Sequence, residues 1–259
     1  MLKAIIAIAA LAAAMTHNIA SAHDLVLIPE PNRSLTVRYG HVGDWLYTDE
    51  MRLVDLTAIS TDNQERVLRR RAARRGVDLS VAAASLGAAT LVAGRYDNGA
   101  WVETTGADGK PEFRNASPLM VRDARSSLWS LKFAKGLFGA AGDTTLYNRA
   151  VGHLLEIIPE RNPASLKPGD ELSVLVRFDG KPLAGARVEL GDLVTKIDED
   201  KIVRFTTDDA GLARVTIRKR GLQLLAVDLE LPNDGSLGEA AKKLGVDKLL
   251  IVATYVFRL

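Results

Sequence analysis

Short apolar runs separated by turn residues fill the second half of this chain, and this regular alternation of strand-like and turn-like segments constrains the fold more than any other feature. Between residues 212 and 218, Leu, Arg and Thr alternate with Ala, Val and Ile, which is the period-two pattern of a half-buried strand. The preceding Asp208–Gly211 segment is typical of a hairpin loop, because glycine adopts the positive φ that a tight turn requires. The branched and aromatic run at 249–259 predicts a strong final strand. Strands recurring about every ten residues indicate a β-sandwich.

The first half is also expected to be β-rich, but its pattern is less regular. The segment 126–139 fits a strand or a helix and is assigned as a strand, whereas 63–79 is helical or extended and exposed. One short helix is expected at 236–245, capped by Ser236 with Glu239 three residues later. The remaining strands of this half are expected at 34–45, 51–60, 88–99, 100–106 and 151–160. We therefore predict an all-β protein with two β-sandwich domains, residues 23–160 and 161–259.

Residues 1–22 have the organisation of a secretory signal peptide. Lys3 precedes an apolar run over residues 4–15, and Ala20 and Ala22 form an A-x-A cleavage site. The run is too short for a stable membrane anchor, so we expect export to the periplasm and no membrane insertion after cleavage. Cleavage after Ala22 would make His23 the first residue. Cleavage after Ala20 is the alternative, and would place His23 third.

Composition excludes several classes of function. The chain has no cysteine, so disulfides, thiolate metal sites and cysteine nucleophiles are excluded. Without residues 1–22 the formal charge is 33 − 32 = +1, because Lys3 is lost, which gives no case for nucleic-acid binding. The arginine run at 69–75 is interpreted as a solvated surface, with an anionic partner as the alternative. No sequence motif of a known catalytic site is present, so an enzyme is not expected.

Three histidines remain after cleavage, namely His23, His41 and His153. Imidazole binds zinc, copper, nickel and cobalt. An N-terminal histidine provides two nitrogen ligands from one residue, the amine and ring Nδ1, and His41 or His153 could add a second imidazole. The other interpretation is that these histidines only pack or form hydrogen bonds. No H-x-x-x-H spacing is present, so their convergence depends entirely on the fold.

Several of these segments together resemble one family, domain of unknown function 4198. They are "AHDLVLIP" at 22–29, "RYGHVGD" at 38–44, the block 152–190, "TTDDAGLARVTI" at 206–217 and the closing "ATYVFRL". The region from about 60 to 130, with its arginine run, departs from the pattern. The resemblance implies two β-sandwich modules, the second like an immunoglobulin or carboxypeptidase-regulatory domain. It also implies a periplasmic component of nickel or cobalt uptake.

Three functions are compatible with these sequence features. The first is a periplasmic metal-binding accessory of an inner-membrane metal transporter, which uses His23, His41 and His153. Its ion is a divalent transition metal, with nickel or cobalt favoured and copper or zinc as alternatives. The second is a metal-free β-sandwich interaction module. The third is a copper histidine-brace oxidase, which the 5% aromatic content disfavours because such an enzyme needs an aromatic binding face.

Overall fold

The computed structural model describes residues 23–30, 32, 34–69, 71–72, 78–82, 86, 89–139, 145–196, 201–237 and 239–259. The predicted signal peptide lies outside these residues, as do four of the seven positions of the arginine run 69–75. Of the described positions, Arg69 is exposed, and Arg71 and Ala72 form a short strand. The prediction of an all-β protein is confirmed, because strands make up 54% of the structure and the described residues contain one α-helix. None of the helices in this part of the chain is long and apolar enough to span a bilayer.

The elements follow one another in a nearly uninterrupted series of strands. They are β1 (Asp24–Pro29), β2 (Leu35–His41), β3 (Asp44–Leu46), β4 (Leu53–Ser60), β5 (Glu65–Val67), β6 (Arg71–Ala72), β7 (Leu79–Val81), β8 (Ala89–Thr105), β9 (Pro111–Arg114), β10 (Ser126–Gly139), β11 (Leu155–Pro159), β12 (Glu171–Phe178), β13 (Lys181–Pro182), β14 (Arg187–Gly191), β15 (Val203–Thr206), β16 (Leu212–Thr216), β17 (Leu222–Pro232), α1 (Glu239–Leu244) and β18 (Lys248–Arg258). Short 3-10 helices lie at Glu50–Arg52, Pro118–Met120, Thr145–Asn148 and Pro163–Ser165.

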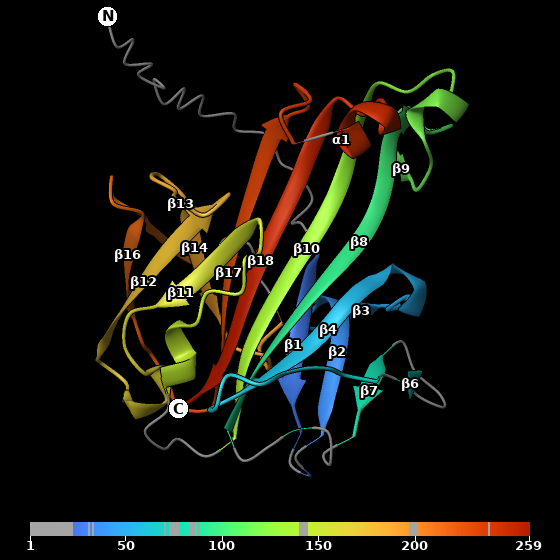
Figure 1. Cartoon of the computed structure of the whole chain (residues 1–259). Coiled ribbons are helices and arrows are strands. Elements are labelled where there is room, and N and C mark those ends of the chain that lie inside the picture. The colour runs from blue at the N-terminus through green and yellow to red at the C-terminus, as the bar shows by residue number, and fades with distance from the viewer. Residues whose placement is uncertain are drawn as a thin grey trace, which may run out of the picture.

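Strands from both halves of the chain form one nine-stranded sheet, which we call the central sheet. Its order is β15-β14-β17-β18-β10-β8-β4-β5, with β9 added at β8. The long strands β17, β18, β10 and β8 run side by side through the molecule (Figure 1). The last strand, β18, pairs in parallel with β10 from Leu128↔Lys248 to Gly136↔Val256. The other strand pairings of the described residues are antiparallel.

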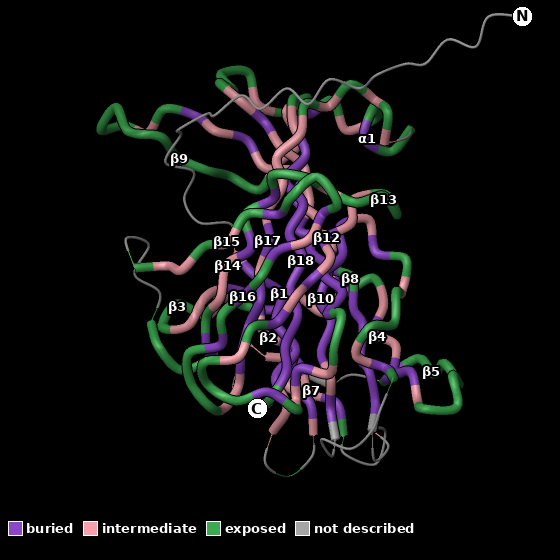
Figure 2. Tube along the Cα trace, turned by 90° about the vertical axis from the view of Figure 1, so that its left-hand side faces the viewer, coloured by how far each residue is buried: buried purple, intermediate pink, exposed green. Residues whose placement is uncertain are grey.

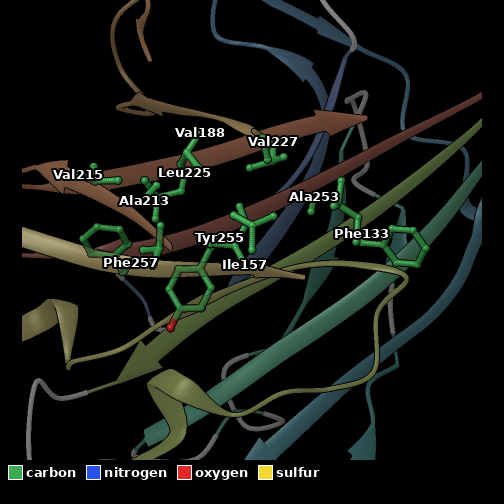
Figure 3. Close-up of a cluster of buried hydrophobic side chains, with 14 of the residues drawn as sticks. Phe133, Ile157, Val188, Ala213, Val215, Leu225, Val227, Ala253, Tyr255 and Phe257 are labelled. Carbon is green, nitrogen blue, oxygen red and sulfur yellow. The ribbon is translucent and has the colours of Figure 1, made fainter. Parts of the chain in front are cut away.

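Two smaller sheets cover opposite faces of the central sheet. The N-terminal sheet consists of β1, β2, β3, β6 and β7, and the C-terminal sheet of β11, β12, β13 and β16. Successive side chains of a strand point to opposite faces, and β18 follows this rule. Tyr255 and Phe257 pack into the core beneath the C-terminal sheet, beside Ile157 and Val215 (Figure 3). Thr254 and Val256 instead face β1. Figure 2 shows the resulting buried interior along β18 and β10.

Burial on both faces explains why the final strand is a continuous apolar run and lacks an alternating pattern. A strand with one wet face alternates apolar and polar residues, whereas a strand covered on both sides does not. Residues 249–257 of β18 are all buried. The strands predicted at 126–139 and 249–259 are both present, as β10 and β18 respectively.

The predicted hairpin around Asp208–Gly211 is not formed. A tight turn is present, with the Gly211 amide donating to the Asp208 carbonyl at 2.9 Å and Gly211 at φ 75°. However, β15 before the turn pairs with β14, and β16 after it pairs with β12. The turn therefore carries the chain from the central sheet to the C-terminal sheet, which turn chemistry alone does not reveal.

The helix expected at 236–245 is present as α1, Glu239–Leu244, and is shorter than predicted. The amide of Ser236, the predicted cap, donates to the Asp234 side chain at 2.8 Å. The predicted junction near 160–169 contains a 3-10 helix at Pro163–Ser165. The central sheet includes strands from both sides of this junction. Strands β8 and β10 precede it in the sequence, and β14, β17 and β18 follow it.

Candidate functional site

The β1–β2 pair brings two of the three histidines together. His23 directly precedes β1 and His41 ends β2, while the register pairs Asp24 with Gly40. Residues opposite one another in antiparallel strands carry neighbouring side chains, so this register sets the two histidines side by side. Their ring centroids are 5.1 Å apart, with an angle of 41° between the ring planes.

A glycine fixes the backbone next to His41. Gly40 has φ +122°, and a Cβ there would lie 2.6 Å from the carbonyl oxygen of Asp44. Only glycine accepts this conformation and approach without strain. The tight β2–β3 turn that results pairs His41 with Asp44. Nδ1 of His41 lies 3.6 Å from Oδ2 of Asp24, so a carboxylate borders the histidine pair.

The ring of His23 packs against the ring of Tyr39. The two rings meet edge to face at a centroid distance of 5.5 Å, and Tyr39 stacks in turn on Tyr96 at 5.3 Å. The side-chain amide of Asn98 donates to the Tyr39 hydroxyl at 2.8 Å. Burial raises the pKa of Tyr39 far above its ordinary value. The phenol therefore stays neutral and rigidly oriented, which restrains the His23 ring.

A buried lysine lies beneath the histidine pair. Lys132 of β10 is 1% exposed, and burial lowers its pKa to about 8, against the opposing effect of Asp24 and Asp228. Burial also lowers the pKa of His23, followed by the effects of His41 and Lys132. His23 is therefore a neutral imidazole at pH 7, the form that binds metal ions.

Charged groups of both signs surround the pair. Burial lowers the pKa of His23 most, and the carboxylates of Asp44 and Asp24 oppose this effect. The cavity beside His41 is lined by the carboxylates of Asp24 and Asp192 and by four basic residues, Lys196, Lys201, Arg218 and Lys219. Asp24 and Asp44 are therefore the carboxylates next to the rings that could offset the charge of a bound cation.

An open cavity of about 400 Å³ adjoins the histidine pair. Asp24, Gly40 and His41 line it on the side of the N-terminal sheet, and Leu190 and Leu224 line it on the side of the central sheet. The cavity gives small solutes a route to the edge of the site, because His41 is one of its lining residues.

The structure does not bring His153 to this pair. His153 precedes β11 and packs against Phe133 at a ring-centroid distance of 5.1 Å. Phe133 belongs to the core under the C-terminal sheet, whereas its neighbour Ala134 belongs to the core under the N-terminal sheet, together with Tyr39. His153 therefore lies across the central sheet from His23 and His41. Burial, with Lys135 and Arg95, lowers its pKa to about 3.

The histidine pair needs further ligands if it is to hold an ion. Among the residues that the structure describes, no three His, Asp or Glu side chains are grouped closely enough to bind a metal. The amine that cleavage would create at His23 is a further nitrogen beyond those side chains.

Lys132 and Tyr39 were not predicted from the sequence. A lysine inside an apolar strand such as 126–139 is a signal that could have identified Lys132, because lysine is rarely buried.

The comparisons with known proteins identify the family of the chain. No curated protein matches this sequence. Residues 20–230 match the family described as Domain of unknown function (DUF4198), and this region contains His23, His41 and His153. Because the match covers most of the chain, the protein belongs to the domain of unknown function 4198 family.

Proposed function

We propose that the protein is a secreted, periplasmic metal-binding protein in which His23 and His41 hold one divalent transition-metal ion. The observation that carries the proposal is the 5.1 Å approach of the two rings at the start of β1. In this proposal residues 1–22 are removed on export, so His23 supplies its α-amine as well as its ring.

The ring separation can be compared with the geometry of bound imidazoles. A metal–nitrogen distance of about 2.0 Å places an ion about 3.2 Å from each ring centroid. Centroids 5.1 Å apart then correspond to a nitrogen–metal–nitrogen angle of roughly 105°. This angle suits a tetrahedral site and favours zinc or cobalt, whereas nickel would take the two rings as neighbouring ligands of a square-planar or octahedral site, at about 90°. A copper brace holds its two imidazoles opposite each other, which requires centroids about 6.4 Å apart.

Cleavage would complete the chelate. The amine has an ordinary pKa of about 7.7–8.0, so a metal ion can displace its proton near neutral pH. Amine and ring belong to one residue, so binding through one positions the other. Asp24, whose Oδ2 lies 3.6 Å from Nδ1 of His41, is placed to orient that ring or to provide an oxygen ligand after a small movement.

The proposed role is delivery of nickel or cobalt to an inner-membrane transporter, without catalysis. Metal binding is supported by the neutral imidazole of His23 and the open cavity at His41, whereas the choice of nickel or cobalt and the transport role follow only from what the family resemblance implies. A metal-free interaction module is the competing interpretation. It accounts for the ring packing of His23 on Tyr39 but assigns no purpose to an N-terminal histidine.

Calorimetric titration of protein that begins at His23 tests the proposal. Nickel, cobalt, zinc and copper salts are titrated into this protein and into a variant with one extra glycine before His23. We expect one ion per chain and an affinity at least about a hundredfold weaker in the extended variant, because the amine is displaced while both rings remain. His41→Ala should weaken binding similarly, whereas His153→Ala is the matched control and should not. Equal affinities for the cleaved and extended proteins would leave the metal-free module as the better account.

A further inference from the structure

A second cavity, of about 410 Å³, lies on the other side of the central sheet. His153, Phe133 and Glu156 are buried in its wall, and Gly152, Asp179 and Gly180 are exposed at its mouth. Arg95 of β8 and Arg177 of β12 also line it. Its volume is within the range of small-molecule sites.

Among the described residues around this cavity, Lys135, Glu156 and Arg95 are paired, whereas Arg177 and Asp179 form no ion pair. Lys135 donates to Glu156 at 2.7 Å, and Glu156 also accepts the amide of Val151 at 2.8 Å. Arg95 forms an ion pair with Asp55. Arg177 lies directly opposite Glu156 in the β11–β12 register, but no ion pair joins them among the described residues.

Arg177 therefore presents a guanidinium group whose hydrogen bonding is incomplete. Its Nε is buried and has no acceptor within the described part of the chain. A buried charged donor without an acceptor is unfavourable, and each such group in a folded protein calls for an explanation. A guanidinium presents its N–H donors in a planar fork that matches the two oxygens of a carboxylate.

We propose that this cavity binds a small organic carboxylate, whose oxygens pair with Arg177 and whose apolar part lies against Phe133. Arg95 also lines the wall, but its charge is paired with that of Asp55, which leaves Arg177 as the guanidinium available to a ligand. Asp179 is at the solvent-exposed mouth, where water screens its charge. The site is separate from His23 and His41, so it does not depend on the proposed metal site.

Calorimetry with acetate, succinate, citrate and benzoate at pH 7 tests this site in the mature, metal-free protein. We expect saturable binding of at least one carboxylate at one site per chain. Arg177→Gln should weaken that binding at least about tenfold. Arg177→Lys keeps the charge but loses the fork, so it should also bind more weakly, and it provides the result if Arg177→Gln does not fold.

Arg214→Gln is the matched control, because Arg214 is an exposed arginine of the same sheet, on β16. Its carboxylate affinity should equal that of the unaltered protein. Absence of saturable binding for all four carboxylates would overturn the proposal, as would unchanged affinity in a folded Arg177→Gln protein. Inorganic phosphate binding as tightly as the best carboxylate would overturn the assignment of ligand class.

Discussion

Acidification should destabilise this protein through the buried imidazole of His153. The ring is 8% exposed and its pKa is lowered from 6.5 to about 3, mainly by burial. The unfolded chain therefore binds a proton at this residue before the folded chain does. The resulting stability is complete above pH 6.5 and is lost as the pH falls from there towards pH 3.

The size of this effect follows from the two pKa values. One pKa unit corresponds to about 1.4 kcal/mol, so a drop from pH 7 to pH 4 should remove about 3 kcal/mol through His153 alone. A folded-state pKa one unit higher than about 3 would change that figure little, because pH 4 still lies well below the unfolded pKa.

The assay compares urea unfolding of the unaltered protein with that of His153→Gln at pH 7 and pH 4. Glutamine cannot take up a proton, so every other titration cancels in the comparison. Relative to the variant, the unaltered protein should lose about 3 kcal/mol between the two pH values. Parallel pH profiles that differ by less than about 1 kcal/mol would refute the reasoning, since the imidazole would then titrate as it does in water.

Two further changes test the interior of the fold. Lys135→Met should lower the free energy of unfolding in urea by about 3–5 kcal/mol, because it leaves the buried Glu156 carboxylate without its ion-pair partner. Adding Glu156→Leu should recover part of that loss. A loss below about 1 kcal/mol in the single variant would contradict the buried ion pair. Thr254→Val removes the hydroxyl that donates to the Leu25 carbonyl at 2.6 Å and should cost about 1–3 kcal/mol in thermal unfolding, whereas Thr254→Ser should retain most of the stability.

Local pattern predicted the strands well but not their partners. The runs at 126–139 and 249–259 could be recognised as strands from their own residues, and they are β10 and β18. Their parallel pairing joins residues about 120 positions apart in sequence, which periodicity does not encode. The turn at Asp208–Gly211 could likewise be identified, although its two strands pair with other neighbours.

The same limit applies to the candidate site. His23 and His41 meet because β1 and β2 pair locally, so a hairpin assignment for residues 24–41 would have been enough to join them. His153 precedes a strand of the other small sheet, and its position across the central sheet depends on which face Phe133 and Lys132 occupy. That choice is made by tertiary packing and cannot be read from residue type.

The parallel partnership of β10 and β18 also governs the order in which the molecule can be built. The Leu25 carbonyl accepts from Thr254, 229 positions later in the chain, and β10 lacks one neighbour in the central sheet until β18 arrives. The second side of β10 and the contact to β1 therefore cannot form until the last residues of the chain have been synthesised. Contacts of such long range slow folding, so we expect completion of the central sheet to be a late event that depends on the final strand.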